Sequence, residues 1–231
     1  MRPRTRSIGG AALMLAIIPI FAGLLACIPE HVPIGNPERA RIDPQMSGYW
    51  YAGNPDEFMG AVIALQPWDK RTWLAINVIM EVDEEGIGGF DISTYDGMVA
   101  LLESEDVDED DMQIGALIFK AWLSKFDGQR MMTWELRAFP DFDDGSLEPW
   151  VWWDFRVTEA TGTTLGLQMV DADSEFLEEV PKTQRDWERV MRKHAKDDAL
   201  YTEEPVVYQR VDPEHEEIFG ALVGAAIVGD L

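Results

Sequence analysis

Apolar and polar residues alternate along several segments of the sequence, and this pattern restricts the possible fold more than any other feature. The alternation is clearest in residues 72–80, 130–139 and 151–157, where every second side chain is apolar. Because a strand turns successive side chains to opposite faces, each segment is expected to be a half-buried antiparallel strand. Shorter strands are predicted over residues 47–51, 60–65, 97–102, 114–122, 164–170 and 205–211.

Turn-forming residues lie between these segments, for example in residues 84–86, 126–129 and 143–146. Roughly eight or nine short strands at such spacing predict a mainly β fold, either an antiparallel barrel or a sandwich. One late α-helix is expected to pack on the sheet before the last strand. Thr183 can cap its first turn, and Trp187, Val190, Met191 and His194 follow at helical spacing.

The amino terminus has the layout of a secretory signal. Arg2, Arg4 and Arg6 precede an uncharged apolar run over residues 8–26. The run ends in Leu-Leu-Ala-Cys at residues 24–27, which resembles the lipobox of bacterial lipoproteins. That resemblance implies cleavage before Cys27 and a lipid on its thiol. Cys27 is the single cysteine of the chain and so has no disulfide partner.

This interpretation gives a provisional division of the chain. Residues 1–26 are a signal peptide, 27–46 a lipidated tether, 47–212 a β domain, and 213–231 an apolar carboxyl-terminal extension. Four prolines between residues 28 and 46 favour an extended spacer. The alternative is that the apolar run stays as a membrane anchor. In the lipoproteins of bacteria with two membranes, Asp after the cysteine tends to hold the protein at the inner membrane. Ile28 stands at that position here, so the resemblance implies the outer membrane.

The charge of the chain excludes some partners. With 43 acidic and 19 basic residues, its formal net charge is −24. Such a surface repels phosphates, so nucleic acid is not an expected partner, and the domain is expected to stand away from anionic head groups. An alternative interpretation of the acidity is a divalent-cation or high-salt setting.

Two stretches resemble a known family. Gly48-Tyr49-Trp50 looks like the Gly-x-Trp that opens the first strand of lipocalins. The later order of two strands, an acidic segment, the helix after Thr183 and residues 204–211 is similar to uncharacterised lipocalin-like lipoproteins of proteobacteria. The resemblance covers less than half of the chain and implies a small closed barrel, but a fold does not fix a function.

No catalytic motif is present. The histidines His31, His194 and His215 fall in separate predicted regions, and neither a nucleophile elbow nor a phosphate-binding loop occurs. Asp106, Asp108 and Asp110 alternate as in calcium loops, yet Asp111 and Leu117 stand where glycine and glutamate are needed. They are weak metal candidates beside a solvated acidic loop. Neither enzyme activity nor a cofactor is predicted.

Tryptophans on the predicted strands are the remaining candidates for a binding site: Trp50, Trp73, Trp134 and Trp153. They could line a pocket for a small apolar ligand or simply fill the core. The predicted function is a membrane-anchored envelope lipoprotein that binds such a ligand or an envelope protein. The alternative is a structural or assembly accessory protein without a pocket.

The apolar stretch over residues 218–228, with Gly220 and Gly224 four apart, is too short to span a bilayer. It is expected either to pack on the domain or to form a helix that docks on a partner.

Overall fold

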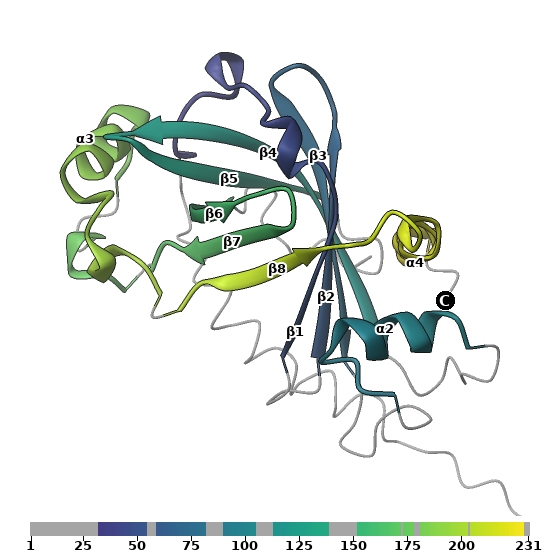
Figure 1. Cartoon of the computed structure of the whole chain (residues 1–231). Coiled ribbons are helices and arrows are strands. Elements are labelled where there is room, and N and C mark those ends of the chain that lie inside the picture. Colours follow the sequence, from purple (N-terminus) through teal and green to yellow (C-terminus); the bar gives the residue numbers. More distant parts are fainter. Residues whose placement is uncertain are drawn as a thin grey trace, which may run out of the picture.

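The computed structural model describes residues 32–54, 59–81, 90–104, 113–138, 152–171, 173–177, 181–202 and 204–228. Its centre is a closed antiparallel barrel of eight strands in simple sequence order (Figure 1). The strands are β1 (Gly48–Asn54), β2 (Met59–Pro67), β3 (Thr72–Glu81), β4 (Gln113–Phe126), β5 (Gln129–Ala138), β6 (Trp152–Ala160), β7 (Thr164–Met169) and β8 (Val206–Arg210). The predicted mainly β fold, as an antiparallel barrel of lipocalin-like form, is therefore confirmed.

Barrel closure depends on the contact between the first and last strands. Each strand pairs with the next, and β1 also pairs with β8 through Trp50 opposite Arg210 and Tyr51 opposite Gln209. The turn between β4 and β5 contains Asp127 at φ 46° and Gly128 at φ 90°. Both residue types tolerate this left-handed backbone, which explains why the predicted turn occurs here.

Alternating side chains produce one inner and two outer apolar clusters. The inner cluster includes Trp50, Trp73, Phe119, Trp134 and Trp153. Leu74, Ile76, Val78 and Met80, the predicted apolar face of β3, belong instead to an outer cluster. The other face of β3 places Trp73 and Ala75 inside the barrel, with the buried polar residue Asn77 on the same face. This strand is therefore buried on both faces, because a helix covers its outer side.

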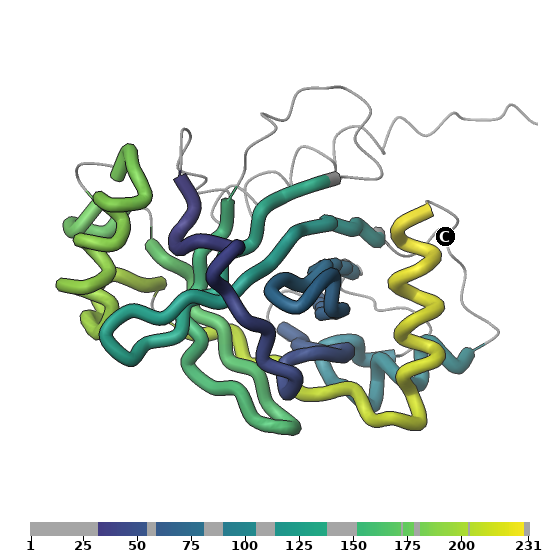
Figure 2. The backbone as a smooth tube through the Cα atoms, turned by 90° about the horizontal axis from the view of Figure 1, so that it is seen from above, coloured from purple at the N-terminus to yellow at the C-terminus, as the bar shows by residue number. Residues whose placement is uncertain are grey.

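The covering helices lie on opposite sides of the barrel (Figure 2). They are α2 (Tyr95–Leu102), α3 (Gln184–His194) and α4 (Glu216–Val228). The first outer cluster joins α2 and α4 to the barrel wall, and the second joins α3 to the outside of β4 and β5. The helix α3 is the predicted late helix, and Thr183 accepts a hydrogen bond from the backbone N–H of Asp186 as expected of its cap.

One predicted strand is wrong. Residues 97–102 lie in α2, which begins after Thr94, whose side chain accepts a hydrogen bond from the N–H of Gly97. Met98, Val99 and Leu101 are buried against the barrel. A short apolar run fits a strand or a helix equally well by sequence, and the Thr94 cap decides in favour of the helix.

The predicted boundary at residue 46 also needs correction. Residues 32–46, here called the strap, pack on the barrel instead of forming an extended spacer. They contain two 3-10 turns, η1 (Pro37–Arg39) and η2 (Pro44–Met46), and Ile34, Ala40 and Met46 are buried. The prolines begin the two turns rather than extending the chain. Any spacer after Cys27 is thus limited to the residues before Val32.

The carboxyl-terminal segment packs on the domain, as one of the two alternatives predicted. Phe219, Leu222, Val223 and Ala226 of α4 are buried in the outer cluster with α2. Residues 213–228 therefore belong to the same compact unit as the barrel.

Candidate functional site

The four predicted pocket tryptophans meet inside the barrel. Trp50 and Trp73 are fully buried, Trp134 is 1% exposed and Trp153 is 7% exposed. Phe119 lies between the rings of Trp134 and Trp153, with centroid separations of 5.1 and 4.9 Å. Such spacings are those of packed aromatic pairs. The interior is occupied by the protein's own side chains, which favours the filled core over the pocket.

Their indole N–H groups differ in hydrogen bonding. Trp50 Nε1 donates to the carbonyl of Met46 at 2.9 Å, and Trp73 Nε1 donates to Ser47 Oγ at 3.0 Å. Trp134 Nε1 and Trp153 Nε1 are buried and have no acceptor among the residues that the structure describes. Buried polar groups are normally paired, so these two N–H groups are exceptions, as is Asn77 Oδ1 on β3.

A groove of about 560 Å³ lies on the outer wall of the barrel, over β6 and β7. Its lining includes Arg156 and Gln168 of these strands together with Asp198, Tyr201 and Thr202. Because β6 turns alternate side chains outward, Arg156 points away from Phe155 and Val157, which belong to the inner cluster.

Three contacts orient the Arg156 guanidinium in this groove. Arg156 Nε donates to Gln168 Oε1 at 3.1 Å, and Nη2 donates to Asp198 Oδ1 at 2.8 Å. The guanidinium also lies 4.1 Å from the centroid of the Tyr201 ring. Gln168 is held in turn, since its Nε2 donates to the carbonyl of Thr202 at 2.6 Å. A planar cation with fixed orientation is suited to bind a carboxylate or another planar anion.

Tyr201 contributes a ring rather than an acid. Burial raises the pKa of its phenol to about 12, so the hydroxyl stays protonated at neutral pH. That hydroxyl donates to the carbonyl of Ala195 at 2.8 Å, which fixes the ring beneath Arg156. The groove thus offers a guanidinium, an amide, a carboxylate and an aromatic face.

A second group of polar residues, joined by hydrogen bonds, holds the strap to the outer wall of the barrel. Ile34 presents its carbonyl to Trp122 Nε1 at 3.1 Å and to Thr133 Oγ1 at 2.9 Å. The backbone N–H of Ile34 donates to Asp154, and Thr133 Oγ1 lies in hydrogen-bond contact with Asp154 Oδ1. These contacts bring residues far apart in sequence into one buried group.

Asp154 is the titratable member of this group. Burial raises the pKa of its carboxyl to about 7, against the lowering effect of hydrogen bonds from Thr133 and Ile34. When Asp154 is protonated, its O–H can donate to Thr133, and the Thr133 hydroxyl can donate to Ile34. When Asp154 is ionised, the single Thr133 hydrogen has two competing acceptors. The neutral acid therefore completes the network.

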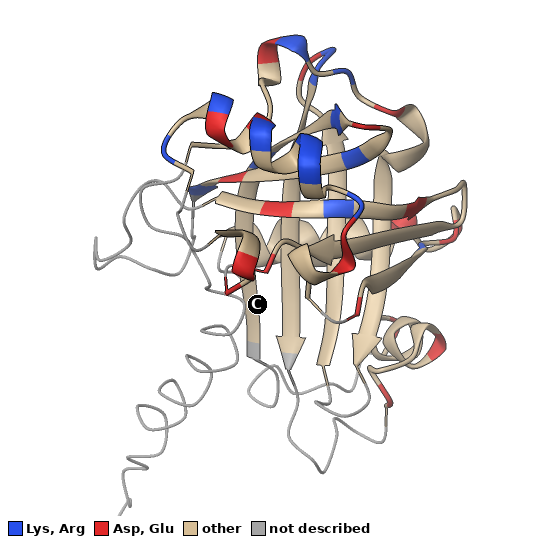
Figure 3. Cartoon of the chain, turned by 90° about the vertical axis from the view of Figure 1, so that its left-hand side faces the viewer, with Lys and Arg blue, Asp and Glu red and all other residues tan. Residues whose placement is uncertain are grey.

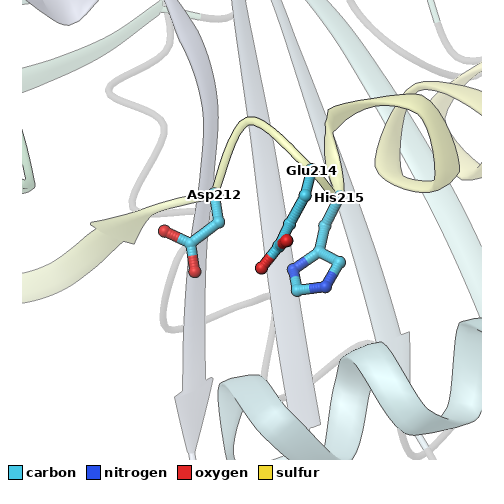
Figure 4. A group of neighbouring side chains, drawn as sticks. All are labelled: Asp212, Glu214 and His215. Carbon is cyan, nitrogen blue, oxygen red and sulfur yellow. The ribbon is translucent and has the colours of Figure 1, made fainter.

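Asp212, Glu214 and His215 gather where β8 leads into α4, as Figure 4 shows. One ligand atom from each lies within 4.8 Å of the others. His215 Nδ1 is 2.9 Å from the Tyr95 hydroxyl, which also accepts from the N–H of Asp212 at 3.0 Å. Both carboxylates are exposed, and these hydrogen bonds join α2 to the start of α4. We assign the cluster a structural role.

The remaining predicted site residues lie outside the described residues. They are Cys27, the expected lipidation site, and the weak metal candidates Asp106, Asp108 and Asp110. Lipidation and calcium binding at these positions stay predictions.

Sequence reasoning missed the groove and the Asp154 network, although part of the signal was present. The alternation in residues 151–157 places Asp154 and Arg156 on the face opposite Trp153 and Phe155. An outward-facing polar residue was expected to meet solvent. The structure covers Asp154 with the strap, and no local pattern predicts that contact.

Comparisons with known proteins identify no protein similar to this chain. No family model, curated protein or solved structure matches this chain. Among the helices of the described ranges, none has the length and apolar character needed to cross a membrane.

Proposed function

We propose that this chain is a lipid-anchored protein of the cell envelope whose barrel is a scaffold for binding on its outer wall. The anchor is the lipid on Cys27, and the binding site is the groove around Arg156. The observation that carries the binding proposal is the contrast between a filled interior and an open outer groove. The ligand chemistry is a carboxylate, either on an envelope protein or on a small molecule.

The ion pair in the groove supports exchange with an external ligand. The Arg156 side chain is 14% exposed, whereas that of Asp198 is 86% exposed. Gln168 and Tyr201 hold the guanidinium in place without Asp198. An incoming carboxylate can therefore replace Asp198 and meet a cation that is already oriented, which lowers the entropic cost of binding.

Photo-crosslinking in intact envelopes tests the groove. A photoreactive residue at exposed Thr158, which lines the groove, is expected to give specific adducts. The same residue at Thr163, on the β6–β7 turn, is the control. Arg156→Gln should reduce the Thr158 adducts at least about fivefold, a loss of roughly 1 kcal/mol. Asp198→Asn should increase them because it removes the internal competitor. If neither substitution changes the yield of Thr158 adducts, the groove is not the binding site.

The anchor is tested separately by mass. The protein purified from membranes should lack residues 1–26 and carry acyl groups on Cys27. Cys27→Ser should move the protein from the membrane to the soluble fraction. Retention of Met1 or an unmodified thiol in the native protein would contradict the anchoring proposal.

A second candidate function, binding of a small apolar ligand within the barrel, is favoured by one observation. Within the described ranges, the buried indole N–H groups of Trp134 and Trp153 have no acceptor. Leaving a buried donor unpaired costs about 1–3 kcal/mol. A mainly apolar ligand with one oxygen acceptor would recover part of that free energy, provided that the aromatic side chains shift to admit it.

Paired substitutions distinguish this candidate. Trp134→Phe and Trp50→Phe remove the same atoms, but only Trp50 loses a hydrogen bond to the protein. Without a ligand, Trp134→Phe should be about 1 kcal/mol less destabilising than Trp50→Phe. With a ligand, native mass spectrometry of gently extracted protein should show an added mass that Trp134→Phe loses. If neither binding test succeeds, the structural accessory role is the function that remains.

A further inference from the structure

A cluster of positive charges in this acidic protein lies on α3 and the residues that flank it. Between residues 182 and 196 the chain has six basic residues and two acidic ones, although acidic residues outnumber basic ones by 43 to 19 overall. All six basic side chains belong to exposed residues. Figure 3 shows Lys and Arg on α3 and the adjoining upper part of the molecule, with few elsewhere. They are Lys182, Arg185, Arg189, Arg192, Lys193 and Lys196.

Half of these charges are neutralised within the protein. Arg189 pairs with Asp186, Arg192 with Glu188 and Lys196 with Asp127. In the described part of the chain, Lys182, Arg185 and Lys193 make no ion pair. The opposite face of the helix, with Trp187 and Met191, is buried on the barrel. The helix therefore presents an excess of positive charge to the outside.

The amino-terminal end of the strap lies beside this helix. Val32 and Val190 both pack against the cluster that contains Ile34, Trp187 and Met191. Only residues 28–31 separate Cys27 from Val32. A fully extended chain advances at most about 3.6 Å per residue, so the Cys27 thiol is within roughly 20 Å of this cluster.

We propose that the exposed basic face of α3 docks on an anionic phospholipid surface when Cys27 is acylated. This proposal rests on the proposed lipid anchor and adds the orientation of the domain on its membrane. The repulsion expected from the net charge is offset locally, since α3 presents exposed positive charges beside the strap. Each Lys or Arg close to an anionic surface contributes favourably, and the attraction decays within a Debye length of about 8 Å in physiological salt.

Lysine labelling of the acylated full chain tests the orientation. The protein is reconstituted in vesicles of phosphatidylcholine alone or with one quarter phosphatidylglycerol, and a water-soluble acetylating reagent is added. We expect Lys182 and Lys193 to react at least about fivefold more slowly on the anionic vesicles, and high salt to abolish the difference. Lys70, on the β2–β3 turn, is the internal control and should change less than twofold.

Charge-removal variants locate the attraction. In Arg185→Gln/Lys193→Gln, the protection of Lys182 should fall at least about threefold. The matched pair Lys70→Gln/Arg71→Gln removes the same charge from the β2–β3 turn and should leave that protection unchanged. Equal effects of the two pairs, or equal labelling on both vesicle types, would overturn the docking proposal.

The mass of the same sample separates the two proposals. If Cys27 carries no acyl group, the proposed anchor fails. If Cys27 is acylated and the lysines react alike on both vesicle types, the anchor stands and the docking of α3 is wrong.

Discussion

The two helical covers of the barrel use different physical interactions. The buried face of the α4 cover is apolar, and α4 contains two glutamates in its first turn but no basic residue. The cover formed by the strap and α3 buries fewer apolar side chains and adds the Asp154 network and a basic outer face. One side of the barrel is therefore held mainly by apolar burial, with hydrogen bonds from Tyr95 to His215 and Asp212, whereas the other can respond to pH and to charged surfaces.

The largest effect is expected on the α4 side. Phe219 is fully buried, stacks on Tyr95 at 5.9 Å and meets the edge of Tyr51 at 6.3 Å. Phe219→Ala should lower the free energy of unfolding by about 3–5 kcal/mol, measured by chemical denaturation. Because the rings in this contact are uncharged at both pH values, the loss of unfolding free energy should be equal at pH 5 and pH 8. A loss of stability at only one of these pH values would show that the α4 side also depends on pH, and the contrast with the strap side would fail.

The strap side should instead depend on pH through Asp154. Its pKa is raised from 3.8 to about 7, so the folded protein holds a proton that the unfolded chain releases. This group's contribution to stability therefore falls as pH rises from about 4 to 7 and is constant above that range. Asp154→Asn mimics the neutral acid. Relative to the unsubstituted protein, it should gain about 2–4 kcal/mol between pH 4 and pH 8.

Unfolding free energies measured across pH for both proteins check this expectation. The difference between the two curves isolates Asp154 from the other carboxylates. A difference that does not vary with pH would show that Asp154 is not the titrating group.

A smaller effect is expected from the hydroxyl beside it. Thr133→Val keeps the shape of the side chain but removes the donor to Ile34, so stability should fall by about 1–2 kcal/mol. Trp122 continues to donate to the same carbonyl, which limits the loss. Thr158→Val, at an exposed position, is the control and should have little effect. Denaturant titration and limited proteolysis of the strap provide the measurements.

The smallest effect is expected from the charges on α3. Arg185→Gln and Lys193→Gln should each change the free energy of unfolding by less than about 0.5 kcal/mol, because neither residue has an ion-pair partner in the described chain. Thermal denaturation would check this. A large loss of stability would mean that the basic face serves folding, and would remove the contrast with α4.

Local patterns predicted the barrel because its strands depend on alternation and turn chemistry. The β4–β5 hairpin, for example, follows from its apolar alternation and from Asp127 and Gly128 at the turn. The helix α2 was mistaken for a strand because its apolar run is short. The same alternation placed the tryptophans on the strands, and it could not decide whether their rings leave a cavity, since that depends on packing across the barrel.

The strap and the groove are contacts between distant parts of the chain. Ile34 meets Thr133 across 99 positions, and Arg156 meets Asp198 across 42. The prolines predicted an extended segment from local propensity. Local propensity does not show which surface a segment will cover, so the packing of the strap on the barrel was missed. The groove likewise exists only after η5 (Asp198–Leu200) packs beside β6 and β7.

The short pairing between β1 and β8 has a mechanical consequence. Pulling on the amino-terminal end loads the strap first and then β1, which shares seven residue pairs with β2 but two with β8. Arg210 of β8 donates to the carbonyls of Gln45 and Ser47, so the last strand also grips the segment that receives the load. Under tension, the hydrogen bonds of Arg210 must break before β1 separates from β8, so they delay opening of the barrel.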